Sequence, residues 1–151
     1  MQYNYRLNRM KIAIGGDHAG FEYKNSIKLH LEKFGHIVED FGPFTEESCD
    51  YPDIAHPLAI SIENGSNEIG VAICGSGNGI NMTLNKHQDI RSALCWETEL
   101  AQLARQHNNA NVLALPSRFI SIELAKECAI AFVNEKFEGG RHERRVNKIK
   151  L

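Results

Sequence analysis

One cysteine and the glycines that follow it have residue types and a spacing that chemistry can use. Cys74 ends an apolar run, and Gly75, Gly77 and Gly79 follow it at alternate positions. An ionised thiol is a strong nucleophile and can take up a proton. Glycines leave backbone N–H groups open to a closely held ligand. The pattern predicts either a reactive thiol beside an anion-binding loop or a tight turn with a buried, inert cysteine.

The segments that must position this thiol alternate between short apolar runs and amphipathic stretches. Strands are expected at residues 11–17, 36–42, 69–74, 90–96 and 111–117. Helical spacing of apolar residues lies between and after them, at residues 21–34, 52–63, 79–87, 97–108 and 121–137. Such alternation predicts a five-stranded parallel sheet with helices on both faces. We therefore expect one doubly wound, Rossmann-like α/β domain with a C-terminal helical tail.

The length and composition fit one globular domain. The chain has 151 residues, a hydrophobic fraction of 42% and a net charge of −2, which gives no general attraction to nucleic acid or membranes. No apolar segment approaches the roughly 20 residues that span a bilayer. Residues 1–10 are polar and aperiodic, so they are expected to be a disordered extension to a domain at residues 11–151. With no apolar signal segment, a cytoplasmic location is expected.

The four cysteines do not form a recognisable metal or redox motif. Cys49, Cys74, Cys95 and Cys128 are scattered, and no two of them have CxxC spacing. The sequence therefore predicts free thiols and indicates neither a zinc site nor a redox motif.

Several polar clusters fall near the expected strand ends. The carboxyl ends of neighbouring parallel strands border one crevice, so we expect these clusters to converge there. They are residues 15–18, 74–79, 106–108 and 117–118.

A nucleotide is the obvious alternative ligand for such a sheet. The dinucleotide fingerprint GxGxxG would need a third glycine at position 80 or 82, where the chain has Ile80 and Met82. The GxxxxGK[ST] pattern is absent as well. Nucleotide binding is therefore disfavoured.

The basic tail offers a different anion site. Arg141 and Arg145 are four residues apart, so on a helix they share a face, and Arg144 and Lys148 make a second such pair. Two guanidinium groups on one face suit a phosphate group. A solvated basic helix end is the other interpretation. Nucleic-acid contact is disfavoured, because the rest of the chain is acidic overall.

Six motifs, in order along the chain, resemble one enzyme family. They are GGDHAGFEYK, DYPD, ICGSGNGI, NKHQDIRSAL, ARQHNNANVLAL and EGGRHERR. Together they resemble ribose-5-phosphate isomerase type B, whose wider family includes the galactose-6-phosphate and allose-6-phosphate isomerases. The resemblance runs from Lys11 to the C-terminus. It implies a Rossmann-like fold, and a dimer or dimer of dimers with active sites shared between subunits.

The resemblance also implies a reaction and its reacting groups. Members of the family interconvert ribose 5-phosphate and ribulose 5-phosphate through a cis-enediolate, in the non-oxidative pentose phosphate pathway, without a metal or cofactor. Cys74 corresponds to the base that moves a proton between C1 and C2. His107 corresponds to the group that helps open the furanose ring. The loop Gly75–Gly79 corresponds to the segment whose N–H groups hold the enediolate oxygens.

Further positions correspond to substrate contacts in the family. Asp17 and His18 match a sugar-binding pair, Arg141 and Arg145 match phosphate-binding arginines, and His142 adjoins them. The remaining substrate-binding positions are Tyr51, Gly75, Ser76, Gly77, Asn78, Gly79, Asn108 and Arg118.

The expected chemistry requires a thiol that can ionise. Cys74 precedes a glycine loop and a short helix, so we expect N–H groups and the helix N-terminus to favour its thiolate. His107 ends its expected helix, where the helix C-terminus favours a protonated imidazole. Two other functions remain open at this point. One is the same reaction on allose or galactose 6-phosphate, and the other is sugar-phosphate or nucleotide binding without catalysis.

Overall fold

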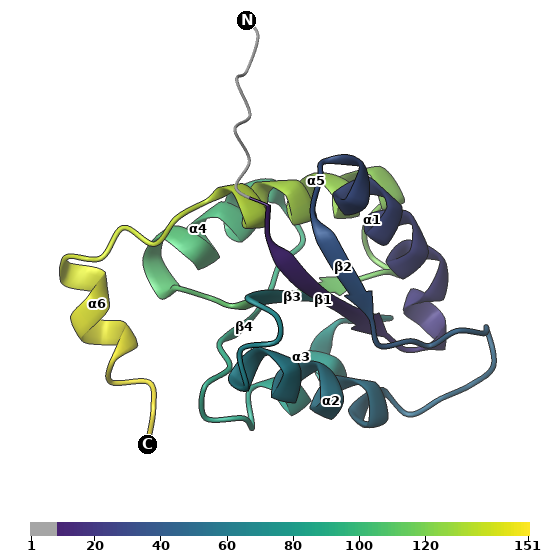
Figure 1. The fold of residues 1–151 in the computed structure, drawn as a ribbon, viewed down its shortest axis with the longest axis horizontal. Coiled ribbons are helices and arrows are strands. Elements are labelled where there is room, and N and C mark those ends of the chain that lie inside the picture. The colour runs from purple at the N-terminus through teal and green to yellow at the C-terminus, as the bar shows by residue number, and fades with distance from the viewer. Residues whose placement is uncertain (1–8) are drawn as a thin grey trace, which may run out of the picture.

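The computed structural model describes residues 9–151, which form a parallel sheet between two layers of helices (Figure 1). Residues 1–8, most of the extension expected at residues 1–10, lie outside this range. The strand order is β2-β1-β3-β5-β4, and every pairing is parallel. The strands are β1 (Lys11–Gly16), β2 (Ile37–Asp40), β3 (Ile69–Cys74), β4 (Ser92–Leu94) and β5 (Val112–Pro116). The predicted doubly wound α/β fold is confirmed.

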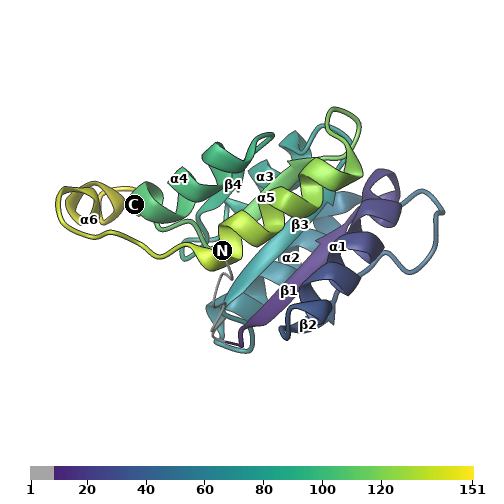
Figure 2. The same ribbon diagram turned by 90° about the horizontal axis from the view of Figure 1, so that it is seen from above.

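Helices cover both faces of this sheet, with α1, α4 and α5 on one side and α2 and α3 on the other (Figures 1 and 2). The helices are α1 (Phe21–Lys33), α2 (Tyr51–Glu63), α3 (Asn78–Leu84), α4 (Thr98–Asn108), α5 (Ile122–Asn134) and α6 (Arg141–Val146), with a short 3₁₀ turn at His18–Gly20. Helix α6 stands away from the sheet beyond α4, as both views show. Within the described residues, no helix has the length and apolar character needed to cross a bilayer.

The side chains of each strand divide between two cores. Ile12 and Ile14 of β1 face the core under α1 and α5, whereas Ala13 between them faces α2 and α3. This follows from the two-residue period of a strand. The central strands β3 and β5 are buried along their whole length. The edge strands β2 and β4 are shorter than expected, because each pairs with a neighbour on only one side.

Different parts of the chain lie at the two ends of the strands, which are called here the carboxyl edge and the amino edge of the sheet. Cys74 lies where β3 ends, and the N–H of Ser117 donates to its carbonyl at 3.0 Å. The turn from α4 to β5 lies at the opposite edge, where the N–H of Gly70 donates to the carbonyl of Asn111 at 2.8 Å. A strand rises about 3.3 Å per residue, so the two edges are separated by roughly the length of β3.

Candidate active site

Cys74 lies at the carboxyl edge of the sheet, facing the first turn of α3. The backbone N–H groups of Gly77, Gly79 and Ile80 hydrogen-bond to its sulfur. Gly77 has a φ of +75°, which a residue with a side chain rarely adopts, and this turn brings the loop around the sulfur. The loop therefore has the donors that the sequence predicted.

The net effect on the thiol differs from the prediction. Burial is the largest influence and raises the pKa of Cys74 above its ordinary value. The three N–H donors oppose that rise, whereas the negative charge of Asp17 adds to it. The expected effect of the loop donors is confirmed in direction, since each hydrogen bond lowers the pKa, but burial outweighs them and the net shift favours the protonated thiol. Cys74 holds its proton in this state and becomes a strong base on losing it.

Two of the loop glycines allow other groups to approach closely. A Cβ at Gly79 would lie 2.4 Å from Cζ of Tyr51, so the tyrosine ring packs directly on the loop backbone. A Cβ at Gly75 would lie 3.1 Å from Nη1 of Arg118. Glycine at these positions lets an aromatic ring and a guanidinium group reach the surroundings of the thiol.

A cavity of about 450 Å³ lies against Cys74, which is large enough for a small sugar phosphate. Its lining combines a thiol, a carboxylate, a guanidinium group and a phenol with exposed loop backbone. The lining residues are Asp17, Tyr51, Cys74, Gly75, Ser76, Gly79, Arg118 and Phe119. Asp17 is 8% exposed, and its Oδ1 accepts from the N–H of Gly20 at 3.1 Å.

A second cavity of about 530 Å³ adjoins the first and shares Asp17 and Tyr51 with it. His18 lines this cavity, and its Nδ1 accepts a hydrogen bond from the N–H of Cys49 at 3.3 Å. An accepting Nδ1 assigns the proton of a neutral imidazole to Nε2. His18 can therefore donate a hydrogen bond to a hydroxyl or carbonyl group.

The loop that carries Cys49 toward His18 is anchored by a buried ion pair. Nζ of Lys24 lies 2.8 Å from Oδ2 of Asp40, and the lysine side chain is 1% exposed. Oδ1 of Asp40 also accepts from the N–H of Gly42 at 2.8 Å, where the loop leaves β2. The loop therefore starts from a fixed point.

The other predicted residues lie elsewhere. His107 and Asn108 end α4, so they lie at the amino edge of the sheet. Arg141 and Arg145 belong to α6, beyond α4 (Figures 1 and 2). Within one chain, the predicted convergence of all clusters in one crevice is wrong. An α-helix that returns from one strand to the next runs antiparallel to both, so its C-terminus lies at the edge opposite to Cys74.

The structure thus divides the predicted residues into two groups. The thiol half-site comprises Asp17, His18, Tyr51, Cys74, the loop at residues 75–79 and Arg118. The basic half-site comprises His107, Asn108, Arg141, His142 and Arg145.

The basic half-site is organised by a pair of stacked imidazoles. The ring centroids of His107 and His142 are 4.2 Å apart, with an angle of 10° between the rings. Loss of hydration, and then the charges of His107 and Arg141, hold the pKa of His142 below its usual value, against the opposing effect of Glu138. Nε2 of each histidine lies 3.9 Å from Oε2 of Glu138.

Two lining or neighbouring residues were missed by sequence reasoning. Phe119 lines the cavity at Cys74 and is 76% exposed. Glu138 faces both histidines of the basic half-site. Glu138 belongs to the EGGRHERR motif, which could have drawn attention to it. Its proximity to His107, 31 positions earlier, depends on the path of residues 135–140 and has no signal in local spacing.

Comparisons with known proteins decide the family. The model of the Ribose/Galactose Isomerase family matches residues 12–149 of the chain. The chain belongs to this family. The predicted resemblance is therefore confirmed.

Individual members of the Ribose/Galactose Isomerase family are similar over nearly the whole length. Ribose-5-phosphate isomerase B of Escherichia coli is 45% identical, over 92% of this chain and 93% of that protein. D-erythrulose-4-phosphate isomerase of Pectobacterium atrosepticum is 43% identical, over 93% of both. Relatives with different sugar phosphates thus have nearly the same identity to this chain.

Two solved structures of the family give the same result. A ribose 5-phosphate isomerase of Thermotoga maritima has a TM-score of 0.92 and 46% identity, covering 95% of this chain and 99% of that one. Ribose-5-phosphate isomerase B of Mycoplasma genitalium, solved with bound ribulose 5-phosphate, has a TM-score of 0.88 and 40% identity, covering 92% and 93%.

Proposed function

We propose that the chain is an aldose–ketose isomerase that interconverts ribose 5-phosphate and ribulose 5-phosphate. Support comes from its membership of the isomerase family and from the ribulose 5-phosphate bound to the similar M. genitalium protein. The observation that carries the proposal is the thiol of Cys74 beside a cavity of about 450 Å³, with three backbone N–H groups directed at its sulfur.

In the proposed mechanism, Cys74 is the base. Its thiolate takes the proton from C2 of the open-chain aldose, which leaves a cis-enediolate. The thiol then returns a proton to C1 while the proton of the C2 hydroxyl passes to the C1 oxygen, which completes the ketose. N–H groups of the loop at residues 75–79 stabilise the negative charge on the enediolate oxygens, and losing one such donor typically costs about 2.7–4 kcal/mol of barrier.

The surroundings of Cys74 tune this step. The raised pKa of Cys74 makes its thiolate a stronger base but a scarcer species at neutral pH. The catalytic rate should therefore rise with pH until the thiol is ionised. Arg118, whose guanidinium group lies over Gly75, lies beside the same cavity and can offset the charge of Asp17.

Other members of the thiol half-site hold the sugar in this proposal. Asp17 and His18 bind sugar hydroxyls, with Nε2 of His18 as a donor, and Tyr51 and Asn78 border the sugar. Arg118 makes a further ligand contact. These side chains place C1 and C2 against the sulfur of Cys74, and such positioning is a large part of enzymatic rate enhancement.

The basic half-site completes the reaction from a second subunit. His107 opens the furanose ring, Asn108 contacts the sugar, and Arg141 and Arg145 bind the phosphate group. Because the two half-sites lie at opposite edges of one sheet, the proposal requires a homodimer or a dimer of dimers with shared active sites. It includes no nucleic-acid or membrane partner and keeps the cytoplasmic location expected from the sequence.

The test is the substitution Cys74→Ala. Loss of the base should lower kcat for ribose 5-phosphate by about 10²–10⁴-fold, and the exchange of the C2 hydrogen with heavy water should be lost with it. Cys128→Ala is the matched control, because Cys128 is a thiol of α5 that is buried in the core and whose pKa is raised to about 11. Near-normal exchange in the Cys74 variant would exclude this residue as the base.

The substrate is tested in the same assay. Relatives of nearly equal identity carry ribose and erythrulose names, so the second candidate is isomerisation of a four-carbon sugar phosphate. The assay compares four sugar phosphates as competing substrates at equal concentrations: ribose 5-phosphate, D-erythrulose 4-phosphate, allose 6-phosphate and galactose 6-phosphate. The highest kcat/KM is expected for ribose 5-phosphate. Saturable binding of all four sugars without hydrogen exchange would indicate a non-catalytic binder.

A further inference from the structure

Three metal-ligating side chains meet where α4 ends and α6 begins. One nitrogen of His107, one nitrogen of His142 and one carboxylate oxygen of Glu138 all lie within 4.8 Å of one another. Each Nε2 is 3.9 Å from Oε2 of Glu138, which is too long for a hydrogen bond. The three groups therefore face one another without bonding directly.

Their separation is close to the spacing that a zinc ion imposes on its ligands. Zn–N and Zn–O bonds of 2.0–2.2 Å in a tetrahedron hold neighbouring ligand atoms roughly 3.4 Å apart. The two histidine-to-carboxylate distances of 3.9 Å exceed this by about 0.5 Å, and the two histidine nitrogens lie within 4.8 Å of each other. A bound ion lies in the plane of each imidazole that holds it, so His107, at 36% exposed, must rotate out of its 10° stack with His142. The Glu138 side chain is 52% exposed and can rotate to close the remaining difference.

The ligand types select among cations. Two imidazoles and one carboxylate are a set that zinc uses in proteins, with a fourth position open to water or another ligand. Imidazole suits Zn²⁺, Co²⁺, Ni²⁺ and Cu²⁺, whereas Mg²⁺ and Ca²⁺ prefer oxygen ligands. The neighbouring Arg141 and Arg145 oppose a cation, but both are exposed and solvent screens their charges.

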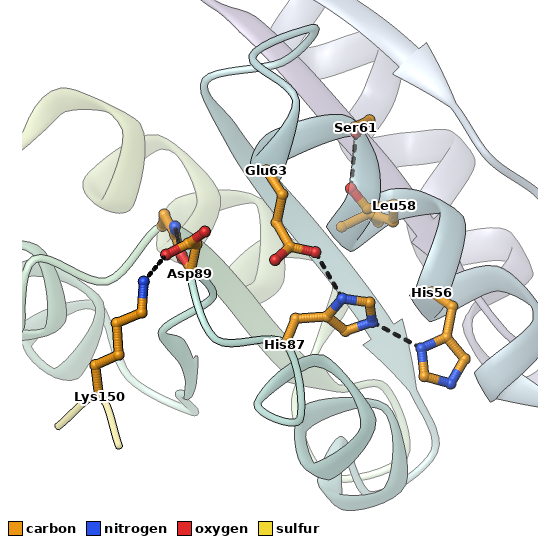
Figure 3. A network of polar contacts seen from close by, with 8 residues as sticks. His56, Leu58, Ser61, Glu63, His87, Asp89 and Lys150 are labelled. Carbon is orange, nitrogen blue, oxygen red and sulfur yellow. Dashed lines mark hydrogen bonds and ion pairs between the residues drawn. The ribbon is translucent and has the colours of Figure 1, made fainter.

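In a second histidine cluster, the nitrogens that could bind a metal ion are already used in hydrogen bonds (Figure 3). Nδ1 of His56 lies 2.7 Å from Nε2 of His87, and Nδ1 of His87 lies 2.6 Å from Oε1 of Glu63. Both nitrogens of His87 are thus used in hydrogen bonds, which link α2 to the loop after α3. A metal ion would have to break these bonds, so this cluster supplies a matched control.

We propose that His107, Glu138 and His142 form a binding site for a divalent transition metal ion of the Zn²⁺ type. The ion is an inhibitor and not a cofactor, because it occupies the nitrogen that His107 would use to open the sugar ring. This consequence rests on the proposed role of His107 in catalysis. Metal binding itself does not depend on that role.

The binding test uses the full-length protein and Zn²⁺ alone, in competition with a chromophoric zinc chelator. The substitutions Glu138→Gln and His142→Ala should each weaken binding by at least about tenfold, since even changes around metal ligands cost 10–100-fold. His56→Ala should leave the affinity unchanged. Equal affinity in the wild type and both site variants, or absence of binding in the wild type, would overturn the proposal.

Cobalt identifies the ligands independently. With Co²⁺ in place of Zn²⁺, the wild-type protein should show the weak visible bands of an imidazole and carboxylate site, and these should be lost in His142→Ala. An intense thiolate-to-cobalt band in the near ultraviolet would assign the ion to a cysteine instead, and would also overturn the proposal.

Inhibition assays distinguish a failure of the proposed metal site from a failure of the proposed reaction. Zn²⁺ should inhibit wild-type isomerisation, EDTA should restore it, and Mg²⁺ should have no effect. Glu138→Gln should resist inhibition relative to its own uninhibited rate, whereas His56→Ala should not. If the protein isomerises no sugar phosphate, the proposed function fails while the metal titration still stands or falls by itself. If Glu138→Gln is inhibited as strongly as the wild type, the metal site is wrong while the isomerase stands.

Discussion

The thiol half-site and the basic half-site differ in how the chain builds them. The first lies at the carboxyl edge of the sheet, where strands β1, β3 and β5 end side by side. Cys74 and Asp17 in it are buried, and its loop is hydrogen-bonded to the sulfur. The second lies at the amino edge and on α6, where Arg141 and Arg145 are exposed.

This difference separates two tasks of the proposed reaction. The proton transfer needs fixed geometry and a shielded base, which the sheet edge provides. Phosphate binding needs charge that reaches outward, which an exposed helix beside α4 provides. Because neither half-site contains all the required groups, we expect activity to appear only when two copies bring opposite halves together.

The largest expected effect comes from mixing two inactive variants. Cys74→Ala and His107→Ala should each retain about one hundredth of the wild-type rate or less. In a mixed dimer, one site combines both defects, and the other combines an intact Cys74 with an intact His107 from its partner. Random reassociation makes half of the dimers mixed, so the mixture should recover roughly a quarter of the wild-type rate. Steady-state assays before and after reversible subunit exchange measure this recovery.

A control mixture tests whether recovery requires the two changes to lie in different half-sites. Cys74→Ala mixed with Tyr51→Ala should show no rate above the average of the two separate variants, because both changes affect the thiol half-site and every site of the mixed dimer keeps one of them. In a mixed dimer of these variants, each site contains one defective thiol half-site. Absence of recovery with His107→Ala as well would show that one chain supplies the whole active site.

A smaller effect is expected from adding a methyl group to each region. Gly79→Ala should destabilise the fold by about 1–3 kcal/mol, because its Cβ would lie 2.4 Å from Cζ of Tyr51. Near the basic half-site, a Cβ at Gly139 would have no atom of the described residues within 4 Å, so Gly139→Ala meets only the strain of its φ of +68°. Urea unfolding of both variants measures the difference.

A double substitution tests whether Tyr51 is the cause. In the variant Gly79→Ala with Tyr51→Ala, the alanine no longer meets a ring. Its free energy of unfolding should therefore be close to that of Tyr51→Ala alone. Additive losses would mean that the methyl group disturbs something other than the tyrosine.

The sheet and the loop after Cys74 could be predicted from the sequence. The alternating runs predicted the five strands and their parallel pairing, and the glycines after Cys74 predicted a loop whose N–H groups face the sulfur. Both depend on local patterns, namely a two-residue or 3.6-residue period and the absence of side chains. Local chemistry also determines where α5 begins, since the side chain of Ser121 accepts from the N–H of Leu124 at 3.1 Å as its N-cap.

Three other features of the two half-sites depend on tertiary packing, which local sequence patterns do not predict. The sign of the pKa shift at Cys74 results from burial competing with three hydrogen bonds, and burial is set by packing. The position of His107 results from the direction in which α4 returns along the sheet. The meeting of His107, Glu138 and His142 results from the path of residues 135–140. Each of these needs the tertiary structure.

The smallest expected effect on stability belongs to Arg145→Ala in the basic half-site. Among residues 9–151, the exposed guanidinium group of Arg145 makes no described hydrogen bond or ion pair, so the free energy of unfolding should change by no more than about 0.5 kcal/mol. KM for ribose 5-phosphate should nevertheless rise about tenfold or more, because a charge-assisted hydrogen bond contributes about 1.5–3 kcal/mol. Arg144→Ala is the matched control: it removes the same charge from the adjacent position of α6, which the family motif does not assign to phosphate. Equal increases in KM for both variants would reduce the basic half-site to a general positive field, whereas an increase confined to Arg145→Ala would show that phosphate is bound by defined side chains that contribute nothing to the fold.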